Sequence, residues 1–348
     1  MALLLTLTVM SLLIAVTVEI NRRVRLDVVS TAAARDRTTL YNTASSGIHA
    51  AMAMLIKDRQ DSDTDSVQED WADPEKISEV LQDVPFERGG VTVDIVDEKG
   101  KIQVNALVEF PESRKFREPQ RQLWLNFLEN FKRLDEDDRF EDVEPETIIN
   151  CLKDWMDFGD DDAVTGLSGA ESDYYLDLEP PYPCRNAPVD HLRELMQVKG
   201  ITPDVYSGDE NQNGMSDFLT VFGMAATREN NFTFDGTINI NTAPLPVIAA
   251  LLPSGDVNLA QALVEYRLET SDDTYIHDLS RPTWYKDVPG FGDETIDPKL
   301  ITVVSDIFRI RSVAVLDEMK MVLTAVVRRE KHEKTGKWTC RVLRWQPE

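Results

Sequence analysis

The chain has 348 residues, 42 % of them hydrophobic and 28 % charged, and its 37 Lys and Arg are outnumbered by 62 Asp and Glu, for a net charge of −25. This composition is ordinary for a folded protein of two or three compact units, and three cysteines are too few for a disulfide scaffold. A negative surface repels phosphate backbones and attracts cations, so a divalent metal is an expected partner and nucleic acid is not.

The first predicted element is a very long helix. Residues 1–18 (MALLLTLTVMSLLIAVTV) carry no charge, and as a helix they span roughly 27 Å, close to the hydrocarbon thickness of a bilayer. Small and apolar residues then recur at three-to-four spacing as far as Leu55, with no proline between. We predict one helix over 1–57 whose apolar half lies in a membrane or filament and whose amphipathic half packs on a globular head. A cleaved signal peptide and an ordinary single-span anchor are the alternatives.

The next two segments are a linker and a pair of strands. Residues 58–73 (DRQDSDTDSVQEDWAD) are polar and acidic, and we predict a solvated loop. Residues 90–108 alternate apolar and polar side chains on both sides of Glu98-Lys99-Gly100, a pattern typical of a β-hairpin.

From about Phe116 the apolar period becomes helical. One stripe begins at Trp124, and a second helix is expected to start at Glu144-Pro145. Further helices are expected within residues 191–198, 244–252 and 258–268. From Leu300 the chain is rich in β-formers, with a turn at 333–336.

These elements predict an α+β fold: a long N-terminal helix with an antiparallel sheet, into which a large all-α domain is inserted. The expected division is 1–57 for the helix, 58–110 for the first part of the head, 111–299 for the helical insertion, and 300–348 for the strands that complete the head.

The segment Asp209–Asp217 (DENQNGMSD) resembles the first nine positions of an EF-hand loop. The matching residues are Asp209, Asn211, Asn213, the sixth-position Gly214, Met215 with its carbonyl, and Asp217. Position twelve is Thr220, where the bidentate glutamate is missing. Weak calcium binding and a merely polar turn both remain open.

A second acidic group lies between the predicted helix at 144–158 and the following loop. Its carboxylates are Asp157, Asp160, Asp161, Asp162, Glu171 and Asp173. So much like charge favours a bound cation, although a solvated acidic loop is the alternative. The chain has no HExxH, GxSxG, P-loop or dinucleotide motif, and its four histidines are scattered, so catalysis is not expected. Cys151 and Cys184 flank this loop and are either a disulfide or two buried thiols.

Several motifs together resemble the minor pseudopilin K (GspK) family of type II secretion systems, within the type IV pilin superfamily. They are LKDWMD at 152–157, GAE at 169–171, YY at 174–175, PPYPCRN at 180–186, HLRELMQVKGITPDVY at 191–206, GTININTAPLPVIAAL at 236–251, and the ending SDIFRIRSVAV, AVVRRE and CRVLRW. They occur in the family's order over nearly the whole chain.

The resemblance implies a pilin-like head with an inserted helical domain, single-pass insertion in the inner membrane of a Gram-negative bacterium, and a head in the periplasm. It implies cleavage and N-methylation by a prepilin peptidase, at Met1 if this numbering starts at the mature residue. Structural calcium is implied in the helical region, where the family pattern falls on Asp157, Asp160 and Glu171. Asp162 joins this predicted ligand set from the local charge alone, and the Asp209 loop joins it from its own EF-hand-like pattern alone.

The implied partners are the minor pseudopilins I and J, the major pseudopilin and the inner-membrane secretion platform. The family's typical fifth residue is Glu, which neutralises the terminal amine of a neighbouring subunit, whereas this chain has Leu5. A lone charge in hydrocarbon costs several kcal/mol. Leu5 therefore predicts a subunit at the filament tip, capping the pseudopilus and starting its assembly for protein export.

The alternative function is that of a membrane-anchored DNA-binding or DNA-uptake protein. Residues 236–267, together with VPGFGDE at 288–294, are similar to helix-hairpin-helix modules, which hold phosphate on the amides of a Gly-rich hairpin. Here Pro253-Ser254-Gly255-Asp256 replaces the hairpin glycines and adds an acid. With a net charge of −25, we expect these helices to contact protein.

Overall fold

The computed structural model describes residues 1–82, 88–111, 113–134, 144–159, 164–209, 212–227, 231–292 and 294–348. The α-helices in these ranges are α1 (Ala2–Asp61), α2 (Pro74–Gln82), α3 (Glu118–Leu134), α4 (Pro145–Met156), α5 (Ser172–Leu176), α6 (Pro203–Ser207), α7 (Leu245–Leu251) and α8 (Val257–Leu268). The strands are β1 (Gly90–Asp97), β2 (Ile102–Gln103), β3 (Leu219–Thr220), β4 (Met224–Ala226), β5 (Phe232–Phe234), β6 (Ile238–Asn239), β7 (Thr270–Ser271), β8 (Thr274–Tyr275), β9 (Ile301–Thr302), β10 (Ile307–Leu316), β11 (Met319–Lys331) and β12 (Trp338–Pro347).

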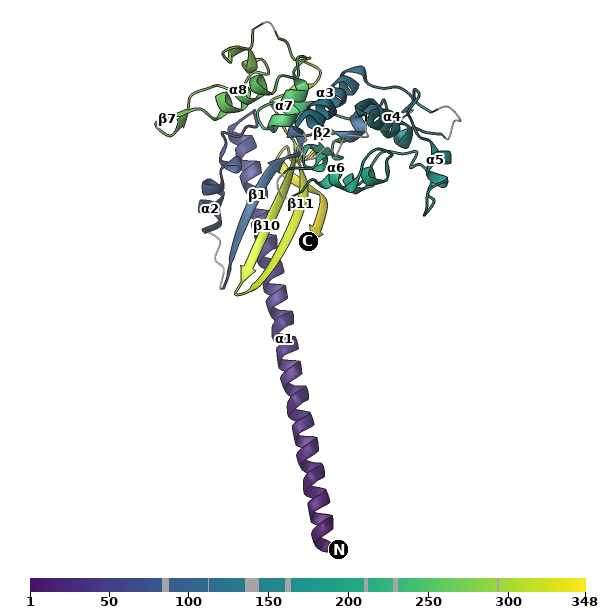
Figure 1. Ribbon diagram of the computed structural model, residues 1–348. Helices are drawn as coiled ribbons and strands as arrows, with labels where there is room; N and C mark the ends of the chain where they lie inside the picture. The colour runs from purple at the N-terminus through teal and green to yellow at the C-terminus, as the bar shows by residue number, and fades with distance from the viewer. Residues whose placement is uncertain are drawn as a thin grey trace.

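Helix α1 is a single rod of 60 residues, which confirms the predicted long helix. Its lower part extends away from the rest of the chain, and the sheet and the helical unit lie at its upper end (Figure 1). By length and composition its apolar stretch is able to cross a membrane. The first fully packed residue along it is Leu40.

Four strands form one antiparallel sheet in the order β1-β10-β11-β12, and α1 packs on one face of it. Small residues on α1 allow a close approach, because Ala44 and Ala51 are buried and Gly47 faces β1 and β10. A Cβ atom at Gly47 would lie 2.5 Å from Ser312 Oγ. The core between helix and sheet is completed by alternate strand residues such as Phe308 and Val327.

The helical unit above the sheet has its own, larger core. Trp124 and Phe127 of α3 are fully buried against α4 and α7. Helix α4 begins as the sequence predicts, with Glu144 as its N-cap and Pro145 in the first turn, where the missing N–H costs nothing. The helix expected within residues 191–198 is a 3-10 helix, Leu192–Gln197.

The predicted hairpin at residues 90–108 is wrong. Strand β1 pairs antiparallel with β10, while β2 pairs in parallel with β3 of the helical unit. Residues Glu98–Gly100 form a 3-10 turn that carries the chain from one core to the other. Ile95 packs under α1 and Ile102 packs in the helical unit, so the chain changes core some ten residues before the boundary expected at 110.

Cys151 and Cys184 are buried thiols. Cys151 Sγ donates a hydrogen bond to the Ser168 carbonyl at 3.3 Å, and Cys184 Sγ lies 3.7 Å from the Ala170 carbonyl. They do not form a disulfide. Burial raises the pKa of Cys151 to about 12, so this thiol stays protonated.

Candidate metal centre

Three carboxylates gather where α4 ends and α5 begins. Asp154 lies in the last turn of α4, Asp157 is the residue that ends it, and Glu171 precedes α5. One oxygen atom from each side chain lies within 4.8 Å of the other two. Asp154 is fully buried and Glu171 is buried, whereas Asp157 keeps a small exposed surface.

A tight loop brings Glu171 back over α4. The Thr165 amide donates to both carboxylate oxygens of Asp154, at 3.1 and 3.0 Å. Gly169 then passes so close that a Cβ atom there would lie 2.1 Å from Asp154 Oδ2. Only glycine allows this approach.

A lysine lies beside the carboxylates. Lys153 Nζ lies 2.8 Å from Asp157 Oδ2 and 3.9 Å from Asp154 Oδ1. Burial raises the pKa of Asp154, because its charge is separated from water. A donor set of three carboxylate oxygens fits a hard divalent cation such as Ca²⁺.

The predicted ligands of this region divide into two groups. Asp157 and Glu171 lie together as expected, whereas Asp160 and Asp162 fall outside the described residues. The sequence analysis missed Asp154, although its spacing of three from Asp157 on one helix places both carboxylates on the same face.

The second predicted site, the Asp209 loop, is a tight turn. Asp209 N donates to the Gln212 carbonyl, and Gln212 N donates to Asp209 Oδ1 at 3.0 Å. Gly214 has a φ of −83°, so it is needed for space and not for an unusual backbone angle, since a Cβ would lie 2.2 Å from the Tyr206 carbonyl oxygen.

The remaining predicted ligands of that loop differ in their exposure to solvent. Met215 is fully buried, Asn213 and Asp217 are exposed, and Asn211 lies outside the described residues. Within the ranges that the structure describes, no three carboxylates gather at this loop. Calcium binding there stays a prediction.

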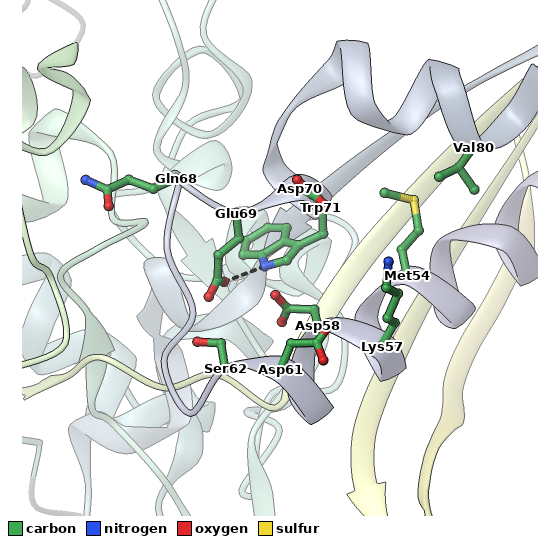
Figure 2. A pocket seen from close by; sticks show the side chains of 10 residues that line it. All are labelled: Met54, Lys57, Asp58, Asp61, Ser62, Gln68, Glu69, Asp70, Trp71 and Val80. Atoms are coloured by element: carbon green, nitrogen blue, oxygen red, sulfur yellow. Dashed lines mark hydrogen bonds between the residues drawn. The ribbon is translucent and has the colours of Figure 1, made fainter. Parts of the chain in front are cut away.

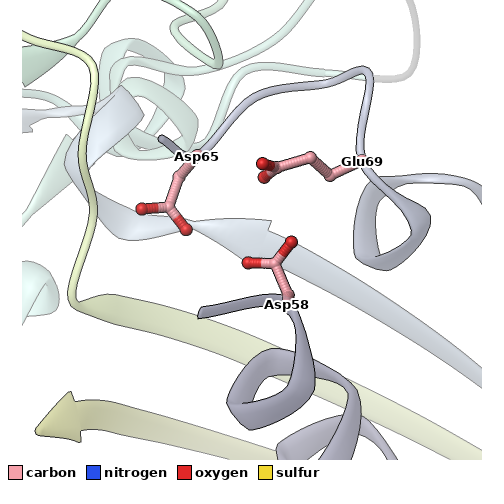
Figure 3. A group of neighbouring side chains, drawn as sticks. All are labelled: Asp58, Asp65 and Glu69. Carbon is pink, nitrogen blue, oxygen red and sulfur yellow. The ribbon is translucent and has the colours of Figure 1, made fainter. Parts of the chain in front are cut away.

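A further acidic cluster lies at the upper end of α1. Asp58, Asp65 and Glu69 point toward one another from the helix end and the loop that follows it (Figure 3). The loop was predicted to be solvated, and this is wrong at its centre, since Asp65 and Trp71 are buried. The acidic sequence pattern did not indicate the buried ion pair that Asp65 forms.

Arg329 of β11 is the cation of this cluster. Its guanidinium, which is almost fully buried, pairs with Asp65 and lies 2.9 Å from Asp58 Oδ2. It also donates to the carbonyls of Leu55 and Ser305. Because a guanidinium held by four acceptors already pairs with two of the three carboxylates, we interpret this cluster as an ion-pair network.

The same network joins the head to the helical unit. The backbone carbonyl of Asp65 accepts hydrogen bonds from the side-chain amides of Asn239 and Asn241, at 3.0 and 3.2 Å. Asn239 also donates to Asp97, which is buried at the end of β1. The motif GTININTAP therefore supplies the polar groups that attach the insertion to the stem.

A solvent-filled pocket of about 290 Å³ opens beside the network. It is drawn in Figure 2, where Asp58 and Glu69 line one side and Glu69 accepts a hydrogen bond from the Trp71 indole at 2.9 Å. Burial, and then the neighbouring Glu69 carboxylate, raises the pKa of Asp58 to about 7.

The raised pKa of Asp58 predicts a pH-dependent stability. An unfolded aspartate has a pKa of about 3.9. Between about pH 4 and pH 7, Asp58 therefore takes up a proton when the chain folds. Because the folded state binds more protons in this range, the free energy of unfolding falls as the pH rises. Asp58→Asn is expected to remove this contribution, up to roughly 1.4 kcal/mol per pH unit. Urea unfolding of the full chain in micelles at pH 5 and pH 8 measures it. Asp61→Asn, an exposed neighbour on the same helix, is the control; parallel profiles for wild type and Asp58→Asn would contradict the prediction.

The α7–α8 pair has the form of two helices joined by a short turn, yet it lacks the chemistry for phosphate. The Asp256 carboxylate accepts hydrogen bonds from the Asn258 and Leu259 amides at the start of α8. A phosphate at this helix end would have to displace a carboxylate of the same sign.

The architecture defines the class of protein. An apolar stem helix that continues into a globular head, where it packs on an antiparallel sheet, is the arrangement of a pilin-like protein. The large helical unit between β1 and β10 separates it from a plain pilin head.

Comparisons with known proteins show similarity to one family. Residues 100–208 and 238–274 match two parts of the family "Type II secretion system (T2SS), protein K". The type II secretion system protein K of Aeromonas hydrophila is 23 % identical over 209 residues, and the aligned region spans 60 % of each chain.

The fold is also that of a solved structure. A chain in the crystal structure of the GspK-GspI-GspJ complex from enterotoxigenic Escherichia coli superposes with a TM-score of 0.62, covering 92 % of this chain and 99 % of that one at 17 % identity. This likeness shows that the fold is GspK-like, with the helical insertion in the same head. In sequence over these two segments, and in fold over nearly the whole chain, the protein resembles the type II secretion system protein K family.

Proposed function

We propose that this protein is the minor pseudopilin at the tip of a type II secretion pseudopilus, where it starts and caps assembly and so assists the export of folded periplasmic proteins. The observation that carries the proposal is the likeness over 99 % of a chain that was crystallised with GspI and GspJ. The corresponding minor pseudopilins I and J are therefore the proposed neighbours. The major pseudopilin and the inner-membrane platform are the remaining contacts of the assembly.

Two features of the stem and head support a place at the tip. Residues 1–18 contain no carboxylate, so Leu5 and its neighbours offer no partner for the terminal amine of a subunit above. The helical unit also spreads to both sides over the upper end of α1, where a further subunit would have to be added (Figure 1).

The stem also supports the proposed location. Residues 1–18 insert in the inner membrane, the head lies in the periplasm, and prepilin-type processing leaves an N-methylated residue at the start of the apolar helix. Intact mass of the membrane-extracted chain tests the methylation.

Position-specific crosslinking tests the tip. A photoreactive residue placed at exposed Val28 on the stem is expected to capture minor pseudopilins I and J, at one end of the filament only. The same residue at exposed Leu167, on the outer side of the helical unit, is the control and is expected to capture neither. Crosslinks from Val28 to the major pseudopilin along the whole shaft would contradict the tip.

We further propose that Asp154, Asp157 and Glu171 hold a structural calcium ion. Their three oxygen atoms, which lie within 4.8 Å of one another, support this, and the ion would fix the loop at residues 164–171 against α4. A ligand that binds only the folded chain stabilises it by about 2.7 kcal/mol at a concentration one hundred times its Kd.

Calorimetry measures the calcium effect. The melting temperature of the full chain in micelles is expected to rise when Ca²⁺ replaces EGTA, and Asp157→Asn is expected to reduce this rise strongly because it removes a ligand charge. Asp177→Asn, which follows α5 outside the cluster, is the control. An equal rise in melting temperature for the wild type and Asp157→Asn would contradict calcium binding at this site.

A further inference from the structure

The end of this acidic chain is basic. Residues 300–348 contain ten Lys and Arg against six Asp and Glu, although the whole chain has a net charge of −25. Three of these arginines lie on the sheet face that turns away from α1. Val327 packs toward α1, so its neighbour Arg328 lies on the opposite face of the sheet. Arg341 and Arg344 of β12 lie on that same face, because they pair with Arg328 and Val326 of β11.

These arginines border a groove of about 510 Å³ between the sheet and the helical unit. Its apolar wall includes Phe222, Phe232 and Met224, and the Met224 side chain is 55 % exposed. The Arg344 guanidinium lies 5.1 Å from the centre of the Phe222 ring. An exposed apolar wall beside cationic groups is typical of a binding surface and not of a solvated face.

More cationic than anionic side chains line the groove. Arg344 and Arg328 each donate to a backbone carbonyl, those of Asp190 and Met224, and Arg328 Nε also lies 3.4 Å from Asp306 Oδ2. Arg341 is exposed and pairs with Glu330 at 3.1 Å. Among the described residues that line the groove, Asp190 is the only carboxylate, and it is already paired with Arg185.

The neighbouring strand offers backbone groups as well. Strand β12 is at the edge of the sheet, and no strand among the described residues pairs with its outer side. An extended segment that lies along such an edge gains main-chain hydrogen bonds, while pockets beside the edge select its side chains.

We propose that this groove binds an extended acidic segment of a partner protein. Its carboxylates would pair with Arg341 and Arg344, an apolar side chain would pack on Phe222 and Phe232, and its backbone would follow β12. Arginine is suited to this task because its planar fork binds carboxylates through two parallel hydrogen bonds.

The position of the groove favours a protein over a lipid headgroup. The apolar run ends at Val18 and the head begins at Leu40, so about 32 Å of helix separates the groove from a membrane. The net charge disfavours a second copy of this chain as the occupant, because two molecules of −25 repel each other.

A labelled peptide tests the groove. Fluorescence anisotropy of the fluorescein-labelled peptide Glu-Phe-Glu-Leu-Glu-Leu-Glu with the full chain in non-ionic micelles is expected to show saturable binding.

The double variant Arg341→Glu with Arg344→Glu is expected to weaken binding at least about tenfold. Lys320→Glu with Lys334→Glu changes the net charge equally, away from the groove, and is expected to bind as the wild type does. Met224→Glu, at an exposed side chain, provides a second variant that leaves the arginines in place and is also expected to weaken binding.

Several outcomes would overturn the inference. They are absence of saturable binding, equal binding by the groove variants and the lysine control, or binding to phosphatidylglycerol vesicles that the arginine variant abolishes. Self-association of the wild type that the same variant abolishes would assign the groove to a second copy instead. The tip function is measured separately by its crosslinks and does not depend on this result.

Discussion

Arg329→Met is expected to lower the free energy of unfolding by about 3–5 kcal/mol, the largest loss of any single change outside the two cores. The replaced guanidinium is buried and satisfies Asp65, Asp58 and two backbone carbonyls. Methionine fills much of the volume but leaves the buried Asp65 charge without the guanidinium, although the Ser305 amide still donates a hydrogen bond to it. Urea unfolding of the full chain in micelles, followed by tryptophan fluorescence, measures the loss.

A matched change separates the buried pair from arginine in general. Arg341→Met removes an exposed arginine paired with Glu330 on the neighbouring strand, and exposed pairs contribute only about 0–1 kcal/mol. Adding Asp65→Asn to Arg329→Met is expected to recover part of the stability, because the uncompensated charge disappears. A loss below about 1 kcal/mol for Arg329→Met would show that the network contributes little.

Gly169→Ala is expected to destabilise the loop over α4 and to abolish the calcium response together. A Cβ atom at this position would lie 2.1 Å from Asp154 Oδ2 and 2.8 Å from the Thr165 backbone, so either the carboxylate or the loop must move. Overpacking of this kind costs about 1–3 kcal/mol, and the displaced Asp154 no longer lies with Asp157 and Glu171. Calorimetry with Ca²⁺ and with EGTA gives both readouts.

The control for that change is another glycine. A Cβ atom at Gly90, which begins β1, meets nothing within 4 Å, so Gly90→Ala is expected to change the free energy of unfolding by less than about 0.5 kcal/mol. A Gly169→Ala protein that melts and responds to Ca²⁺ as the wild type does would show that the loop accommodates the methyl group without moving Asp154.

The sequence predicted the elements whose signals are local. The uninterrupted apolar period gave α1, the stripe from Trp124 gave α3, and Glu144-Pro145 marked the start of α4. The β-forming residues from Leu300 onward likewise predicted the strands of the sheet. In each case one face of the element is buried, and burial leaves a period in the sequence.

The errors concern partners that are distant along the chain. Residues 90–108 alternate as a hairpin does, but the partner of β1 is β10, more than two hundred residues away, and an alternating pattern does not identify its partner. The residues around Asp65 have the composition of a solvated linker. Asp65 is buried because it pairs with Arg329, which is distant along the chain. In the candidate site, Asp157 and Glu171 were predicted from charge density, whereas Asp154 was missed because it belongs to a helix that also contributes to the core.

Because α1 is unbroken, the stem is a rigid rod and not a flexible tether for the head. No glycine or proline occurs between Ala2 and Ser46, and sharp helix kinks arise almost only at such residues. The 60 residues of α1 amount to roughly 90 Å, so a tilt of about 10° at the apolar end moves the head sideways by roughly 15 Å. Arg329 fastens the far end of this helix to β11, and the Asp65 carbonyl joins it to the helical unit. A sideways load on the head is therefore carried down to the membrane end as torque, with no hinge along the way to absorb it.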